Sequence, residues 1–246
     1  MYLFNSLKSM VRQMKTFAAI AATTVGLASS VSAQTIVEAH SISNGPGSAA
    51  QTVVMGQGNG KFVGQSGASN GGTAMTFVQG SSTNGGFVNA QGTSISNGPG
   101  LARTTVIGEA QFGANVQVQG TSLANFGHAE SFSRGTGIGN AQVISTATAQ
   151  SQFGPPAIAN SQAFGMGNGG PVMVRSEAFS NAIYVPTNVN VTASGVVQNG
   201  GSANVTAVGL GHGTGPGPVV VYVNGSAQVM NGGYANTSVT GYGSGR

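Results

Sequence analysis

The chain has 246 residues, 42 of them glycine, and it contains no cysteine, no tryptophan and no aspartate. Charged residues make up 5% of the sequence, whereas ordinary globular domains contain roughly 25%. The lack of cysteine excludes a disulfide framework, so stability has to come from packing and backbone hydrogen bonds. Valine and threonine recur in strand-like alternation, which favours a β-structure over disorder.

The segment 1–33 has the pattern of a secretory signal peptide. Met14-Lys15 precedes an apolar stretch from Thr16 to Ala28, and the segment 31–33 supplies a small-x-small cleavage site. The segment 1–13 is then either part of this leader or an upstream extension of the reading frame. Removing 1–33 leaves five basic residues against four glutamates, a net charge of +1 in place of +4. A nearly neutral chain has no basic stripe for nucleic acid and no lysine cluster for anionic lipid.

A turn signal, usually Asn-Gly-Gly, Asn-Gly-Pro-Gly or Phe-Gly, returns about every 14 residues between Asn44 and Asn231. Repetition on this scale predicts an array of short strands rather than an enzyme fold. The glycines that end these signals are expected to be structural turn residues. They include Gly47, Gly72, Gly86, Gly100, Gly170 and Gly233.

Residues that follow each of these glycines alternate in size with a period of two, as the two faces of a strand do. Even positions carry small apolar or hydroxyl residues, such as Ala102, Thr104 and Val106. Odd positions carry the large and charged residues, such as Leu101 and Arg103. The pattern predicts that the even face is buried and that it joins closely spaced sheets.

Two architectures fit this period. One is an up-and-down antiparallel meander with one strand of about ten residues per block. The other is a β-roll or solenoid whose coil has two strands of about five residues. Further glycines inside blocks, at Gly80, Gly92 and Gly120, indicate a bend or a close backbone approach. We therefore expect an all-β solenoid or β-roll with a period of about 14 residues. The regular array is expected over 34–180, followed by less regular β-repeats over 181–246.

The combination of a secretion signal, Gln-Gly and Asn-Gly steps and alternating small residues resembles bacterial surface-fibre proteins of the curli type. It is also similar to the short-period β-roll heads of trimeric autotransporter adhesins. The likeness covers most of the chain after the leader and is one of composition, because curli-type repeats are longer and keep a fixed glutamine and asparagine spacing. This resemblance implies a structural or adhesive extracellular role.

The sequence offers few groups for catalysis. Without aspartate it has no Ser-His-Asp triad, no aspartate-rich calcium repeat and no EF-hand loop. Glu38 with His40, and His128 with Glu130, each share one strand face, and we expect solvated pairs there rather than a metal site. The chain is therefore expected to be no enzyme and to need no cofactor or metal.

Large aromatic residues on the odd face form the candidate contact surface, for self-association or for stacking on glycans. The alternative is that these aromatic side chains have a structural role and pack under loops or cap neighbouring coils. They are Phe77, Phe87, Phe132, Tyr222 and Tyr234.

Scarce charge and strand-like segments at 34–37 and 218–223 favour end-to-end or cross-β stacking. We expect a secreted, extracellular or cell-surface structural protein that self-associates into a fibre or matrix. The alternatives are a discrete surface adhesin or glycan-binding module, and a largely disordered secreted protein. The expected partners are other copies of the chain and, as a second candidate, surface glycans. Nucleic acid and membrane insertion after leader removal are not expected.

Overall fold

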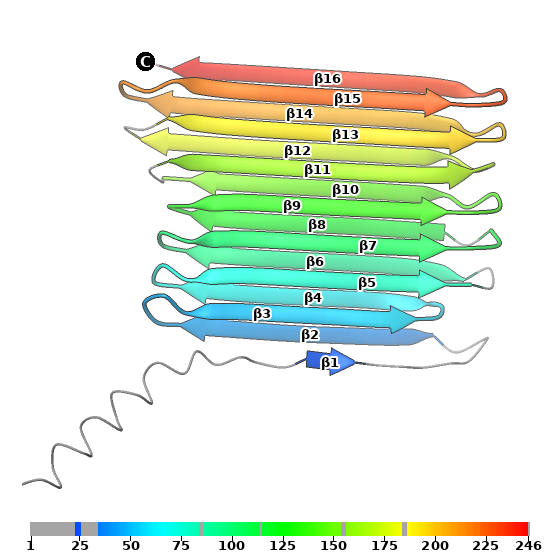
Figure 1. Cartoon of the computed structure of the whole chain (residues 1–246), viewed down its shortest axis with the longest axis horizontal. Coiled ribbons are helices and arrows are strands. Elements are labelled where there is room, and N and C mark those ends of the chain that lie inside the picture. The colour runs from blue at the N-terminus through cyan, green and yellow to red at the C-terminus, as the bar shows by residue number, and fades with distance from the viewer. Residues whose placement is uncertain are drawn as a thin grey trace, which may run out of the picture.

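The computed structural model describes residues 23–25, 34–83, 86–113, 115–153, 156–183 and 186–245 (Figure 1). These residues are all-β, and no helix long and apolar enough to cross a membrane occurs among them. The strands are β1 (Thr23–Val25), β2 (Thr35–Asn44), β3 (Ala49–Gln57), β4 (Gly60–Ser69), β5 (Thr73–Ser82), β6 (Phe87–Asn97), β7 (Leu101–Ala110), β8 (Asn115–Asn125), β9 (His128–Gly137), β10 (Val143–Gln152), β11 (Ala157–Asn168), β12 (Val172–Ile183), β13 (Thr187–Gln198), β14 (Ser202–Thr214), β15 (Val219–Val229) and β16 (Tyr234–Gly245). The predicted leader lies outside the described residues except for β1.

Strands with odd numbers form one sheet, here called sheet A, in the order β1-β3-β5-β7-β9-β11-β13-β15. Strands with even numbers form sheet B, in the order β16-β14-β12-β10-β8-β6-β4-β2. Neighbours within each sheet are parallel and follow a repeat of about 28 residues; for example, Ala74 of β5 lies opposite Ala102 of β7. Consecutive strands run in opposite directions and lie in different sheets, so the chain winds as a β-solenoid of about seven coils (Figure 1). The predicted solenoid is confirmed, and parallel pairing rules out the meander.

We expected each 14-residue block to be one coil with two short strands, and this was wrong. One 14-residue block contains a single strand, and one coil contains two blocks. Gly80, Gly92 and Gly120 lie inside β5, β6 and β8, with no bend. A Cβ at Gly92 would lie 2.7 Å from Cγ2 of Thr104 and 2.8 Å from Cγ2 of Val106. This glycine therefore makes room for side chains of the facing sheet, which is the close-approach role that glycine also has in strands.

The coils continue past residue 180, where the sequence predicted a less regular segment, and they become longer. At the N-terminal end Thr35 of β2 lies opposite Gly60 of β4, so that coil is shorter than the usual repeat. At the C-terminal end Ser202 of β14 lies opposite Tyr234 of β16, so that coil is longer than the usual repeat. This gradual lengthening explains why the turn period loosens in the C-terminal third.

The core is a narrow layer between the two sheets, built from the small even-face residues as predicted. Ala102, Thr104 and Val106 are fully buried, whereas Arg103 between them is exposed. Phe62 is also fully buried. Its ring lies beside Gly56 and Gly80, where a Cβ would come closer than 3.0 Å to ring atoms. The core therefore accommodates one large side chain by placing glycines opposite it.

A column of hydroxyl groups runs through this core and links the sheets. The oxygens of Ser66, Thr76, Ser94, Thr104 and Ser122 lie 2.7 to 3.0 Å from one another in succession. Backbone carbonyls accept from the same hydroxyls, including the carbonyl of Thr121 at 2.7 Å from Thr104 Oγ1. Buried hydroxyls satisfied in this way stabilise the core and fix the register of the two sheets.

Glycines at one edge of the solenoid allow successive coils to approach closely. A Cβ at Gly72, Gly100 or Gly127 would come closer than 3.0 Å to the carbonyl oxygen of Ser48, Gly72 or Gly100, respectively, in the coil before it. Because the obstacle is backbone, no side-chain rotation could relieve the contact. These glycines are therefore required by coil stacking and not by an unusual φ.

The remaining predicted turn glycines have three different explanations. A Cβ at Gly170 would meet the carbonyl oxygen of Ala141, and one at Gly86 would lie 2.7 Å from Ser82 Oγ. Gly47 has φ of 68° with open space around it, and Gly233 has φ of 143°. Backbone conformation, which glycine adopts without a steric penalty, accounts for Gly47 and contributes at Gly233.

Candidate functional site

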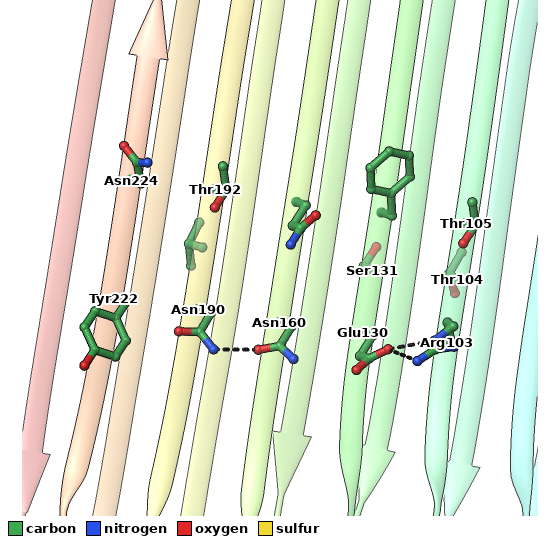
Figure 2. A pocket seen from close by; sticks show the side chains of 13 residues that line it. Arg103, Thr104, Thr105, Glu130, Ser131, Asn160, Asn190, Thr192, Tyr222 and Asn224 are labelled. Carbon is green, nitrogen blue, oxygen red and sulfur yellow. Dashed lines mark hydrogen bonds and ion pairs between the residues drawn. The ribbon is translucent and has the colours of Figure 1, made fainter.

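The outer face of sheet A carries a cavity of about 540 Å³, here called the sheet A trough (Figure 2). Two rows of side chains cross β7, β9, β11, β13 and β15 in register and form it. The first row is Arg103, Glu130, Asn160, Asn190 and Tyr222, and the second is Thr105, Phe132, Gln162, Thr192 and Asn224.

Amide side chains occupy the middle of the trough, with larger side chains toward its two ends. Asn160 and Asn190 lie between Tyr222 on β15 and Glu130 on β9 (Figure 2). Tyr222 has 66% of its surface exposed. Phe132, in the second row of β9, is half-buried. The floor therefore offers amide donors and acceptors between two aromatic side chains.

The charged groups of the trough neutralise each other. Nη2 of Arg103 lies 2.6 Å from Oε2 of Glu130, and its Nε donates to the same oxygen at 2.7 Å. Beside them, Nδ2 of Asn190 donates to Oδ1 of Asn160 at 2.9 Å. That bond uses one of the two N–H groups of Asn190, so the amide row keeps further hydrogen-bonding capacity.

A second cavity, of about 300 Å³, adjoins the trough and shares Phe132 with it. Arg134, Phe164 and Met166 are among its lining residues. The rings of Phe132 and Phe164 have centroids 5.6 Å apart and are tilted by 41°. This contact holds Phe132 at the junction of the two cavities.

The five predicted contact residues do not share one surface. Phe77, Phe132 and Tyr222 lie on the outer face of sheet A, while Phe87 and Tyr234 lie on sheet B. Phe132 and Tyr222 line the trough, and Phe77 lies opposite Thr105 at the end of the second row. The reason is that consecutive blocks alternate between the sheets, so the odd faces of neighbouring blocks point to opposite sides.

Sequence reasoning missed the amide row that joins these aromatics. The spacing from Asn160 to Asn190 and the spacing from Asn190 to Tyr222 both exceed two blocks, and the two spacings differ from each other. The row is therefore hidden from a search at the block period. Alignment at the coil period, with allowance for lengthening coils, would have found it.

The pairs considered for metal binding have other partners. Glu38 has an oxygen 4.0 Å from Nζ of Lys61, and Nδ1 of His40 lies 3.1 Å from Oε1 of Gln65. Glu130 pairs with Arg103. Within the described ranges, no group of three or more histidine and glutamate side chains could hold a metal ion.

A second distinctive surface is the end of the described array formed by β15 and β16, here called the open end (Figure 1). Val239 of β16 faces the interior but has 46% of its surface exposed, whereas Ala207, its partner in β14, is fully buried. Among the described strands, β16 pairs with β14 alone. Neither β15 nor β16 contains a charged residue or a proline.

The comparisons with family models, curated proteins and solved structures gave no match. The chemistry of the two surfaces therefore supplies the evidence on function. The open end can extend both sheets, because it presents backbone donors, backbone acceptors and small apolar side chains in the spacing of the core. The trough can take a neutral ligand by hydrogen bonding and stacking.

Proposed function

We propose that the protein is a secreted, non-catalytic structural protein whose copies associate end to end into an extracellular fibre or matrix. The single observation that carries this proposal is the open end, where core-facing residues such as Val239 are exposed. Exposed apolar surface of this kind usually marks a contact site. The unpaired strand edge beside it offers a row of backbone hydrogen bonds to an incoming strand.

A second copy of the same chain fits this surface because the inward pattern repeats along the array. The open end presents Ala235, Thr237 and Val239. The first coil has the same inward pattern of small residues, and its Val37 and Ala39 are buried in the described structure. Since each solenoid coil is stabilised mainly by its neighbours, stacking one copy on another with β2 beside β16 repeats in sheet B the contacts that hold the coils together.

Edge strands of soluble proteins usually carry charge, proline or a bulge that prevents such stacking. The open end has neither charge nor proline in β15 and β16. A net charge of +1 after leader removal gives little electrostatic repulsion between copies. In the resulting fibre the strands would run across the long axis, the cross-β arrangement of amyloid-like assemblies.

The leader pattern supports secretion, and the distribution of carboxylates supports a non-catalytic role. Glu38, Glu130 and Glu177 each form an ion pair with a lysine or arginine, which leaves Glu109 as the fourth glutamate of the chain. Surface ion pairs of this kind are typical of solvated faces. Glycan binding, the alternative function, is compatible with assembly because the trough is formed by outward side chains of sheet A, whereas assembly uses the inward side chains and the free backbone edge of the open end.

Electron microscopy and X-ray fibre diffraction of purified residues 34–246 test this proposal. We expect long filaments with a meridional reflection at about 4.7 to 4.8 Å. Val239→Lys should abolish them, because it places a charge where the next copy would pack. Thr240→Lys is the matched control, since Thr240 lies on the outer face of the same strand.

Analytical ultracentrifugation of the same samples measures association directly. The wild-type chain should sediment as large assemblies, and Val239→Lys as a single small species with an unchanged circular dichroism spectrum. A wild-type chain that stays monomeric at high concentration would falsify the proposal. Loss of filaments in both lysine variants would show that charge, and not the open end, controls association.

A further inference from the structure

We propose that the sheet A trough binds a chain of a neutral polysaccharide that runs along the solenoid axis, across β9 to β15. The inference goes beyond fibre formation and does not depend on it. It rests on the size of the trough, its polar groups, its charge balance and its two aromatic side chains.

The size of the trough is compatible with a ligand site. Its volume of about 540 Å³ lies within the range of roughly 300 to 1,000 Å³ that is usual for ligand pockets. From Phe132 on β9 to Tyr222 on β15 there are three strand spacings of about 4.8 Å, or about 14 Å in all. This length suits several units of an extended polymer rather than one small molecule.

The polar groups of the floor are neutral and act both as donors and as acceptors. Asn160, Gln162, Asn190 and Asn224 contribute amides, and Thr192 contributes a hydroxyl. Sugar hydroxyls also donate and accept, so they can pair with both the oxygens and the N–H groups of these side chains. Gln162 and Asn224 are exposed, which leaves their amides accessible from solvent.

The aromatic side chains supply the apolar part of the site. A pyranose ring has a face of C–H groups that packs against an aromatic ring, with its hydroxyls around the rim. Tyr222 on β15 provides one such ring, and Phe132 on β9 provides a second. An aliphatic chain or a membrane would leave the amide floor without partners, which is costly once water is excluded.

The charge of the trough selects a neutral polymer over an anionic one. Arg103 is neutralised by Glu130 within the trough. Another cation, Arg134, lines the adjoining cavity instead. Anionic polymers such as nucleic acid rely on several lysine or arginine contacts, and the trough offers one paired arginine.

Affinity electrophoresis in native gels tests the proposal with named probes, in the Val239→Lys background so that association between copies does not affect migration. Hydroxyethyl cellulose and dextran serve as neutral polymers, and heparin serves as the anionic one. We expect migration of the protein to be retarded by at least one neutral polymer and not by heparin. Tyr222→Ala should weaken this binding about tenfold, the upper range for one aromatic contact.

The matched control is Tyr242→Ala, because Tyr242 is 62% exposed and lies on the outer face of sheet B. Gln162→Ala in the trough and Gln119→Ala on sheet B form a second pair of exposed glutamines. The trough variants should lose retardation while the sheet B variants keep it. No retardation by either neutral polymer, retardation by heparin alone, or equal loss in both members of a pair would overturn the proposal. Filament formation, scored separately without Val239→Lys, should persist in Gln162→Ala and Gln119→Ala, because β11 and β8 lie inside the array and away from the open end.

Discussion

Replacement of Gly127 by alanine should destabilise the solenoid at the contact between two coils. The new Cβ would come closer than 3.0 Å to the carbonyl oxygen of Gly100. That oxygen accepts a hydrogen bond from the backbone N–H of His128 at 3.0 Å, so pushing it away breaks a bond between the coils. An unsatisfied backbone group costs about 1 to 3 kcal/mol. Overpacking costs a further 1 to 3 kcal/mol or so.

Because the two coils can relax in part, we expect the free energy of unfolding to fall by about 2 to 4 kcal/mol. Urea unfolding followed by circular dichroism measures this, at low protein concentration so that association contributes little. Gly67→Ala is the control, since Gly67 is a strand glycine of β4 with nothing within 4 Å of its Cβ position. Its unfolding free energy should change by less than about 0.5 kcal/mol. Equal urea midpoints for the two variants would refute the stacking role of Gly127.

Two further substitutions probe the core and a turn. Thr104→Val removes a hydroxyl that lies 2.7 Å from the carbonyl oxygen of Thr121, and should lower stability by about 1 to 3 kcal/mol. In the same urea titration Thr105→Val, on the outer face of that strand, should be nearly neutral, and an equal loss would show that the hydroxyl column is unimportant. Phe112 has φ of 58° and is 73% exposed, so Phe112→Asn should raise stability by about 1 kcal/mol, because asparagine tolerates this conformation better. A lower melting temperature for Phe112→Asn would mean that its ring makes a stabilising contact.

The face of each strand could be predicted from the sequence, because alternation is a local property of a few residues. Thr104 between Ala102 and Val106 marks the buried face as clearly in the sequence as in the structure. The number of strands per coil could not be predicted in this way. The number of strands depends on whether Gly92 bends the chain or makes room for Thr104 and Val106 of the facing sheet. Only packing across the core decides between these two roles.

The candidate sites were predictable to a smaller extent. Phe132 and Tyr222 could be selected by residue type. The asparagine and glutamine residues between them could not, because amide side chains are common in the chain and only their alignment across the sheet marks them as part of a site. That row is created by parallel pairing between strands one coil apart, such as Arg103 with Glu130 and Asn190 with Tyr222. The strand-like sequence of 218–223 predicted a C-terminal region that stacks on other copies. The exposure of Val239 could not be predicted, because it depends on which coil lies beside it.

Alternation of strands between the two sheets makes the parity of the strand count important for assembly. With β1 present each sheet has eight strands, so β15 and β16 of one copy could be followed in alternating order by β1 and β2 of the next, although β1 covers only Thr23–Val25. Cleavage after Ala33 would remove β1 and leave sheet A one strand shorter than sheet B. Every head-to-tail joint between such copies would then contain a vacancy one strand wide in sheet A. Joints of this kind would accept a single extended peptide, so the junctions, rather than the coils, would be where such a filament is most readily capped or labelled.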